Sequence, residues 1–262
     1  LQKTVRFYEN NATAYLRTHP LTGERLSDMQ NREQSVSYRQ VADSPDFLLV
    51  RAKLRAMLGT PSEAVREFEN LLRDKKFVSE GATHFGLAIA LTRQREWAAA
   101  EVELSRARQS KVSAALLDRQ LAEVKLARGD NNAALAIYRE AMLRYPLNLA
   151  LVYGYGQALI KVRRFDDAQH FAELQLQNYP QDVRLHKMRA ESYAGLGRGA
   201  QQHQALAEAF ALQGQTAGAI EQLLHAQRAG DADFYEQSVI ETRLGELRKR
   251  LAEEQKEKRN WR

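Results

Sequence analysis

Alanine recurs at a fixed interval along this chain. The steps from Ala100 to Ala134 and from Ala134 to Ala168 are both 34 residues, and Gln202 occupies the next position of the series. A period of 34 residues is typical of stacked helix–turn–helix units, each of which buries its apolar face against its neighbours. The spacing therefore predicts an all-α, right-handed helical solenoid, an architecture that more often binds other proteins than performs chemistry.

The clearest units cover residues 115–148 and 149–182. In the first, we expect Gly129 to end one helix, because glycine readily adopts a positive φ, and Pro146 to block the continuation of the second helix. In the next unit, Gly156 stands where two helices cross closely, Phe165 at the turn and Pro180 at the end. These spacings of small residue, aromatic residue, alanine and proline resemble the tetratricopeptide pattern.

Weaker versions of the pattern cover residues 45–78, 81–113 and 183–214, and residues 215–230 form a final half-unit. From Asp231 onward, apolar residues recur at helical spacing: Phe234, Val239, Ile240, Leu244, Leu247 and Leu251. We expect this helix to cap the solenoid; the alternative, a partner-binding coiled coil, is disfavoured by the short apolar pattern. The chain thus divides into a non-repeating segment over residues 1–40, a solenoid over 41–230, and a capping helix with a basic tail over 231–262.

Composition and charge exclude several function classes. Cysteine is absent, which excludes disulfides, thiolate zinc sites and a cysteine nucleophile. The formal net charge is +6, but basic and acidic residues are mixed in the last turns of the chain and no nucleic-acid-binding motif accompanies them. We therefore expect a solvated helix face and no nucleic-acid partner. The longest uncharged run, residues 145–160, contains proline and glycine and is too short to span a membrane.

The segment "THPLTGERLSDMQNR", which begins at Thr18, does not follow the repeat. It resembles the closing segment of the catalytic domain in bacterial zinc metallopeptidases of the BepA (YfgC) family, in which a tetratricopeptide domain follows. This chain keeps that order, with His19, Pro20 and Arg25 ahead of repeats that begin near Pro45. The resemblance implies a periplasmic protein of a Gram-negative bacterium that acts in quality control of outer-membrane β-barrel proteins and docks on the β-barrel assembly machinery.

The catalytic motif of that family is missing here. Two histidines four residues apart on a helix hold the zinc and the enclosed glutamate activates water, yet no two of the six histidines have this spacing. We therefore expect no enzymatic activity, cofactor or metal site in this chain, and zinc only in the parent protein. The resemblance implies that His19 approaches the zinc cleft and regulates access, with Arg25 supporting the loop or polarising substrate. The alternative is that His19 and Pro20 only form a turn before a helix that starts at Thr22.

In tetratricopeptide arrays the first helix of each repeat lines the concave face. Aligning the repeats predicts a protein-binding groove from these residues: Phe85, Ile89, Arg93, Arg119, Glu123, Leu126, Tyr153, Gln157, Lys161, Arg184, Lys187 and Glu191. Such a groove suits an extended or partly unfolded polypeptide, with acidic groups or a terminal carboxylate favoured by the arginines and lysines. The alternative is that these residues form ordinary solvated helix faces.

Two functions follow from these observations. The first is the client- and partner-binding domain of a zinc metalloprotease. The second is a stand-alone adaptor or scaffold with no linked protease. The chain begins at Leu1 without a signal-peptide pattern, so we expect it to be part of a longer protein, which favours the first function.

Overall fold

A computed structural model of the chain describes residues 22–35, 43–110 and 115–260. The predicted helix ending near Tyr8 and the loop that follows it lie outside these ranges. Contacts divide the chain into two compact units, residues 1–44 and 45–262. In the first unit, helix α2 (Thr22–Ser35) confirms the helix predicted to start at Thr22.

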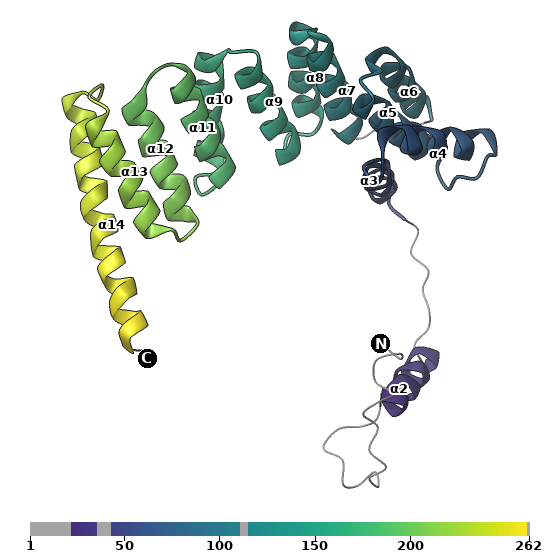
Figure 1. Ribbon diagram of the computed structural model, residues 1–262, viewed down its shortest axis with the longest axis horizontal. Coiled ribbons are helices and arrows are strands. Elements are labelled where there is room, and N and C mark those ends of the chain that lie inside the picture. The colour runs from purple at the N-terminus through teal and green to yellow at the C-terminus, as the bar shows by residue number, and fades with distance from the viewer. Residues whose placement is uncertain (1–21, 36–42, 111–114, 261–262) are drawn as a thin grey trace. The chain divides into compact units, whose positions relative to one another are not determined.

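The second unit consists of helices throughout its described residues, each packed on the next (Figure 1). The five antiparallel pairs are α3 (Pro45–Ala56) with α4 (Pro61–Arg73), α5 (Glu80–Arg93) with α6 (Trp97–Gln109), α7 (Ala115–Arg128) with α8 (Asn131–Arg144), α9 (Leu149–Lys161) with α10 (Phe165–Asn178), and α11 (Val183–Gly195) with α12 (Gly199–Leu212). Helices α13 (Thr216–Arg228) and α14 (Phe234–Asn260) follow. The predicted all-α solenoid of paired helices is confirmed.

The turn inside each pair contains a residue with a positive φ. One residue after the first helix has a positive φ, and these residues keep the repeat spacing from the second pair onward: Gly59, Arg95, Gly129, Arg163 and Gly197. In the first pair, Thr60 N after Gly59 donates to Oε2 of Glu63. In the last four pairs the amide of the next residue donates instead to a carbonyl five residues back, as from Asp130 N to Lys125 O at 2.9 Å and from Arg164 N to Leu159 O at 2.9 Å. This closure satisfies carbonyls that the helix end would leave unpaired. It confirms the role predicted for Gly129.

The alanines of the 34-residue series lie where the two helices of a pair cross. Ala100, Ala134 and Ala168 are all 0% exposed, so no larger side chain fits at these crossings. Gln202, at the corresponding position of α12, is partly buried. Around these crossings the buried side chains form three successive clusters, contributed by α3 to α7, by α7 to α11 and by α12 to α14.

Two glycines allow large side chains to cross a neighbouring helix. A Cβ on Gly86 would lie 2.3 Å from Cε1 of Phe68, and one on Gly156 would lie 2.1 Å from Sδ of Met188. Real Cβ contacts are never this short, so only glycine fits at both positions without a shift of the neighbouring side chain. The close crossing predicted at Gly156 is therefore confirmed, and it joins α9 to α11.

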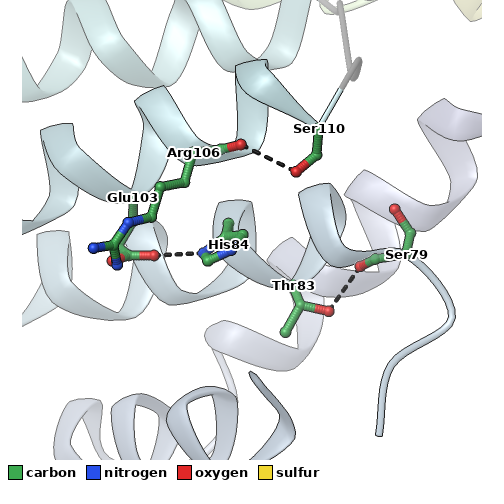
Figure 2. Close-up of polar contacts among 6 residues, drawn as sticks. All are labelled: Ser79, Thr83, His84, Glu103, Arg106 and Ser110. Carbon is green, nitrogen blue, oxygen red and sulfur yellow. Dashed lines mark hydrogen bonds and ion pairs between the residues drawn. The ribbon is translucent and has the colours of Figure 1, made fainter. Parts of the chain in front are cut away.

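A buried polar group also ties α5 to α6. Figure 2 shows the ring of His84 facing the carboxylate of Glu103, with Nδ1 2.6 Å from Oε2. Arg106, one turn along α6, donates to the other oxygen of that carboxylate. The Glu103 side chain is 9% exposed, and burying a carboxylate is tolerable because both of its oxygens have partners. His84 is therefore a structural residue of the helix pair.

Helix α14 packs its apolar side on α13, through Ile240, Leu244 and Leu247. Polar contacts extend this packing: Arg243 forms an ion pair with Glu208 of α12, and Thr216 of α13 donates to Glu254. Phe234, expected on the apolar stripe, is instead 90% exposed in the first turn of α14. No helix within the described ranges has the length and apolar character needed to cross a membrane.

Candidate functional site

The first helices of three successive repeats surround an open cavity of about 550 Å³. Helices α7, α9 and α11 supply most of its lining, and Tyr138 reaches it from α8. The lining residues are Arg119, Glu123, Leu126, Tyr138, Ala150, Tyr153, Gly154, Gln157, Ala158, Ile160, Lys161, Arg184 and Glu191. The size lies in the range of ligand-binding pockets, which is about 300–1,000 Å³.

The repeat spacing explains why these residues meet. Tyr153 is 34 residues after Arg119, and Gln157 stands midway between Glu123 and Glu191 at the same interval. Residues one repeat apart occupy equivalent positions on parallel helices, so their side chains point into the same space. The cavity thus combines eight of the twelve predicted groove residues: Arg119, Glu123, Leu126, Tyr153, Gln157, Lys161, Arg184 and Glu191.

Tyr138 forms the apolar floor of the cavity. Its ring is 1% exposed, and it fits because a Cβ on Gly154 would lie 2.6 Å from its Cε1. Burial raises the pKa of the Tyr138 phenol well above its usual range, and the negative charge of Glu123 acts in the same direction. Glu123 itself accepts a 2.9 Å hydrogen bond from Arg119 Nε, so these two charges largely cancel.

Tyr153 links two walls of the cavity. Its hydroxyl donates to Oδ2 of Asp182, the residue that caps the N-terminus of α11, and the guanidinium of Arg184 lies 5.0 Å from the centre of its ring. Burial, and then the hydrogen bond to Asp182, raises the pKa of Tyr153 to about 12. Tyr153 therefore stays neutral at physiological pH and holds Arg184 at one end of the cavity.

The middle and far end of the cavity have different chemistry. Gln157 Nε2 donates a 3.2 Å hydrogen bond to Oε2 of Glu191, which places an amide and a carboxylate at mid-height. Lys161, in the last turn of α9, is exposed and forms no ion pair or hydrogen bond with the described part of the chain. Its ammonium group is thus available to a bound partner.

Four predicted groove residues do not line this cavity. Phe85 and Ile89 are 1% and 5% exposed and belong to the core, so their assignment to the groove was wrong. The reason is that α5, unlike the later first helices, is buried around most of its circumference between α3, α4, α6 and α7.

Arg93 does not line the cavity either. Its guanidinium donates to Ala56 O at 2.7 Å and Gly59 O at 3.0 Å, so it closes the end of α3. Lys187, the residue of α11 equivalent to Arg119 and Tyr153, is exposed but does not belong to the cavity lining.

The residues predicted to act near a zinc cleft fall elsewhere. His19 lies outside the described residues, and Arg25 lies in α2 without a described side chain. Within the described ranges, no three histidine, aspartate or glutamate side chains gather in a way that fits a metal ion.

Sequence alignment of the first helices alone missed Tyr138, which belongs to a second helix. The sequence feature that could have indicated Tyr138 is the pair Gly154 and Gly156 in one helix. Each glycine leaves space for a large side chain of a neighbouring helix. Ala150 and Ala158 widen the same face of α9.

The repeated helix pairs and the cavity on their first helices define a tetratricopeptide-repeat solenoid, and residues 125–191 match the tetratricopeptide repeat family model. The chain is also similar to the β-barrel assembly-enhancing protease of Yersinia pestis, with 25% identity over 249 residues. That match covers 92% of this chain and 50% of the protease, so the chain spans about half the length of this curated relative. The predicted resemblance to a protease of this kind is confirmed by the match.

Solved structures of repeat proteins resemble the chain as well. MamA of MSR-1 aligns with a TM-score of 0.47 and 19% identity, over 66% of this chain and 98% of MamA. YrrB, described as a tetratricopeptide protein with an unusual peptide-binding site, aligns with a TM-score of 0.47 and 15% identity, over 78% of this chain and 97% of YrrB.

Proposed function

We propose that this chain is the polypeptide-binding part of a protease that acts in the assembly and quality control of outer-membrane β-barrel proteins. The observation that carries the proposal is the cavity between α7, α9 and α11, which places apolar, amide and charged groups on equivalent positions of three repeats. An extended polypeptide offers the same repeating mixture of side chains and backbone amides, so it is the ligand that such a surface suits.

The similarity to the Yersinia pestis protease supports the rest of the proposal. By this resemblance the parent is a periplasmic zinc metalloprotease, and residues 1–40 correspond to the end of its catalytic domain. The cavity then captures stalled barrel proteins or docks on the β-barrel assembly machinery. His19 would act near the zinc of that parent, with Arg25 in support, whereas this chain supplies binding alone.

Binding of an unfolded outer-membrane β-barrel polypeptide, labelled with a fluorophore and added to the purified chain, tests the function. We expect the double variant Lys161→Glu with Arg184→Glu to weaken binding at least tenfold, since both charges line the cavity, while far-ultraviolet circular dichroism stays unchanged. Lys187→Glu is the matched control, because this lysine lies on α11 outside the lining. Equal binding by all three proteins would reject the cavity as the binding site.

The second candidate function is a stand-alone adaptor with no linked protease. The coding DNA upstream of Leu1 distinguishes the two. An in-frame His-Glu-x-x-His motif upstream supports the protease, whereas an upstream region that encodes only a signal peptide supports the adaptor.

A further inference from the structure

The charges around the cavity do not cancel. Arg119 is neutralised by Glu123 at 2.9 Å, and Glu191 is hydrogen-bonded by the neutral amide of Gln157. Lys161 and Arg184, both exposed, have no carboxylate partner among the described residues. Each therefore presents a positive charge to whatever enters the cavity.

These two cations stand at opposite ends. Arg184 is held at the level of Tyr153 by its position 5.0 Å from the centre of that ring. Lys161 follows Tyr153 by eight residues on the same helix, which corresponds to a rise of about 12 Å. A single carboxylate cannot bridge such a separation, because its two oxygens lie only about 2 Å apart and ion pairs need contacts near 3 Å. This argues against recognition of one terminal carboxylate by both groups.

The space between the two cations is apolar and roomy. Gly154 and Ala158 line that stretch of α9, and the buried ring of Tyr138 forms the floor beneath Gly154. A large apolar side chain is the complement of such a surface. The carboxylate of Glu191, whose hydrogen-bond partner Gln157 is neutral, lies at the same level. An acidic side chain would therefore be repelled there, whereas backbone N–H groups of an extended peptide would be accepted.

An extended peptide matches these distances. Its side chains alternate between two faces, so residues i, i+2 and i+4 share one face, and residues i and i+4 are about 13 Å apart. We propose that the cavity selects an extended segment with an apolar residue flanked by acidic residues two positions away on each side. This inference rests on the proposed function, and it names the chemistry of the segment that the cavity recognises.

Three blocked, fluorophore-labelled peptides test the spacing against the intact chain. The first has two aspartates four positions apart with phenylalanine midway and serine elsewhere. The second has the same composition with both aspartates directly beside the phenylalanine, and the third replaces the aspartates by asparagines. We expect the first peptide to bind most tightly at low salt, with about a fivefold loss for each exposed ion pair removed. The difference between the first and third peptides should shrink as salt is raised.

Single variants then assign each aspartate to its cation. We expect Lys161→Ala and Arg184→Ala each to weaken binding of the first peptide about fivefold. In each variant, replacing one of the two aspartates should no longer change the affinity, and that aspartate should differ between the two variants. Lys187→Ala serves as the control and should bind like the parent chain.

If the first and second peptides bind equally, the proposed spacing is wrong although polypeptide binding stands. If no peptide binds and the unfolded barrel polypeptide also fails to bind, the proposed function itself is wrong. If the barrel polypeptide binds and all three peptides fail, the acidic-apolar-acidic segment is rejected as the recognised element.

Discussion

The hydroxyl of Tyr153 on α9 donates to Oδ2 of Asp182, 29 residues further along the chain. The other oxygen of that carboxylate accepts from the backbone amides of Arg184 at 2.8 Å and Leu185 at 3.1 Å, which caps α11. A single carboxylate thus begins one helix and anchors the aromatic ring of another. The cap and the wall of the cavity depend on each other.

Replacing Tyr153 by phenylalanine isolates this contact. We expect Tyr153→Phe to lower the free energy of unfolding by about 1 kcal/mol, because one hydrogen bond is lost while the ring under Arg184 remains. Urea unfolding measures the effect, and Tyr235→Phe, at a residue that is 76% exposed, is the control. Equal stability of all three proteins would show that the hydroxyl contributes nothing.

The same tyrosine predicts a pH dependence. Its pKa is raised from the ordinary value of 10 to about 12, so its contribution to stability is complete below pH 10 and is lost as the pH rises through 12. Tyrosinate absorbance measured during an alkaline titration should show that folded Tyr153→Phe has one fewer phenol titrating above pH 10 than the parent chain. A titration curve identical to that of the parent chain would contradict the assignment.

His186 predicts the opposite behaviour at mildly acid pH. Burial lowers its pKa below the ordinary 6.5, Nε2–H donates to Pro180 O at 2.9 Å, and the buried Nδ1 has no hydrogen-bond partner in the described chain. The unfolded state therefore binds the proton more readily, and stability present above pH 6.5 is lost as the pH falls through the lowered pKa. We expect the stability advantage of the parent chain over His186→Gln to shrink between pH 7 and pH 5 in thermal unfolding. An advantage that grows instead would mean that the folded protein binds the proton.

Two glycine-to-alanine changes in helices should have opposite signs. Gly86→Ala should destabilise by about 1–3 kcal/mol, because the new Cβ would overlap the fully buried ring of Phe68. Gly245→Ala, on α14 with nothing within 4 Å, should stabilise by about 0.5–1 kcal/mol through helix propensity alone. Chemical denaturation of both variants measures the difference. Similar effects of the two changes would show that the Phe68 contact does not constrain position 86.

A change at Arg93 tests whether this residue contributes to stability or to peptide binding. We expect Arg93→Ala to cost about 2 kcal/mol, because its charged hydrogen bonds to Ala56 O and Gly59 O are lost, and to leave peptide affinity unchanged. Arg139→Ala, at an exposed position of α8, is the matched control for stability. A loss of peptide affinity without a loss of stability would show that Arg93 belongs to the peptide-binding groove after all.

The sequence predicted the helices and their order well, because helix crossings and turns in a repeat depend on the type of residue at a few fixed positions. Ala100, Ala134 and Ala168 predicted the crossings, and Gly129 predicted a turn with positive φ that the structure confirms. Arg95 and Arg163 adopt that same conformation without glycine, and only the regular spacing of the repeat indicates it. The helix predicted from Thr22 was likewise readable from its residues.

The cavity was only partly readable. Alignment of equivalent positions brought together Arg119, Glu123, Tyr153, Gln157 and Lys161, because residues one repeat apart face the same space. Phe85 and Ile89 occupy the matching positions in an earlier repeat yet are buried, and the repeat pattern is identical in both cases. What differs is how many neighbouring helices surround each position.

The sequence by itself therefore determined the all-α repeat, its turns and the set of positions from which a groove is drawn, since those follow from helical periodicity and backbone preference. Only the tertiary structure decided which of these positions are open, which side chain from a second helix forms the floor, and which charges already have partners. Burial and charge pairing depend on distances between residues far apart in sequence, such as Tyr153 and Asp182, or Tyr138 and Gly154 across a helix crossing. Those distances are set by the packing of whole helices, which no local pattern encodes.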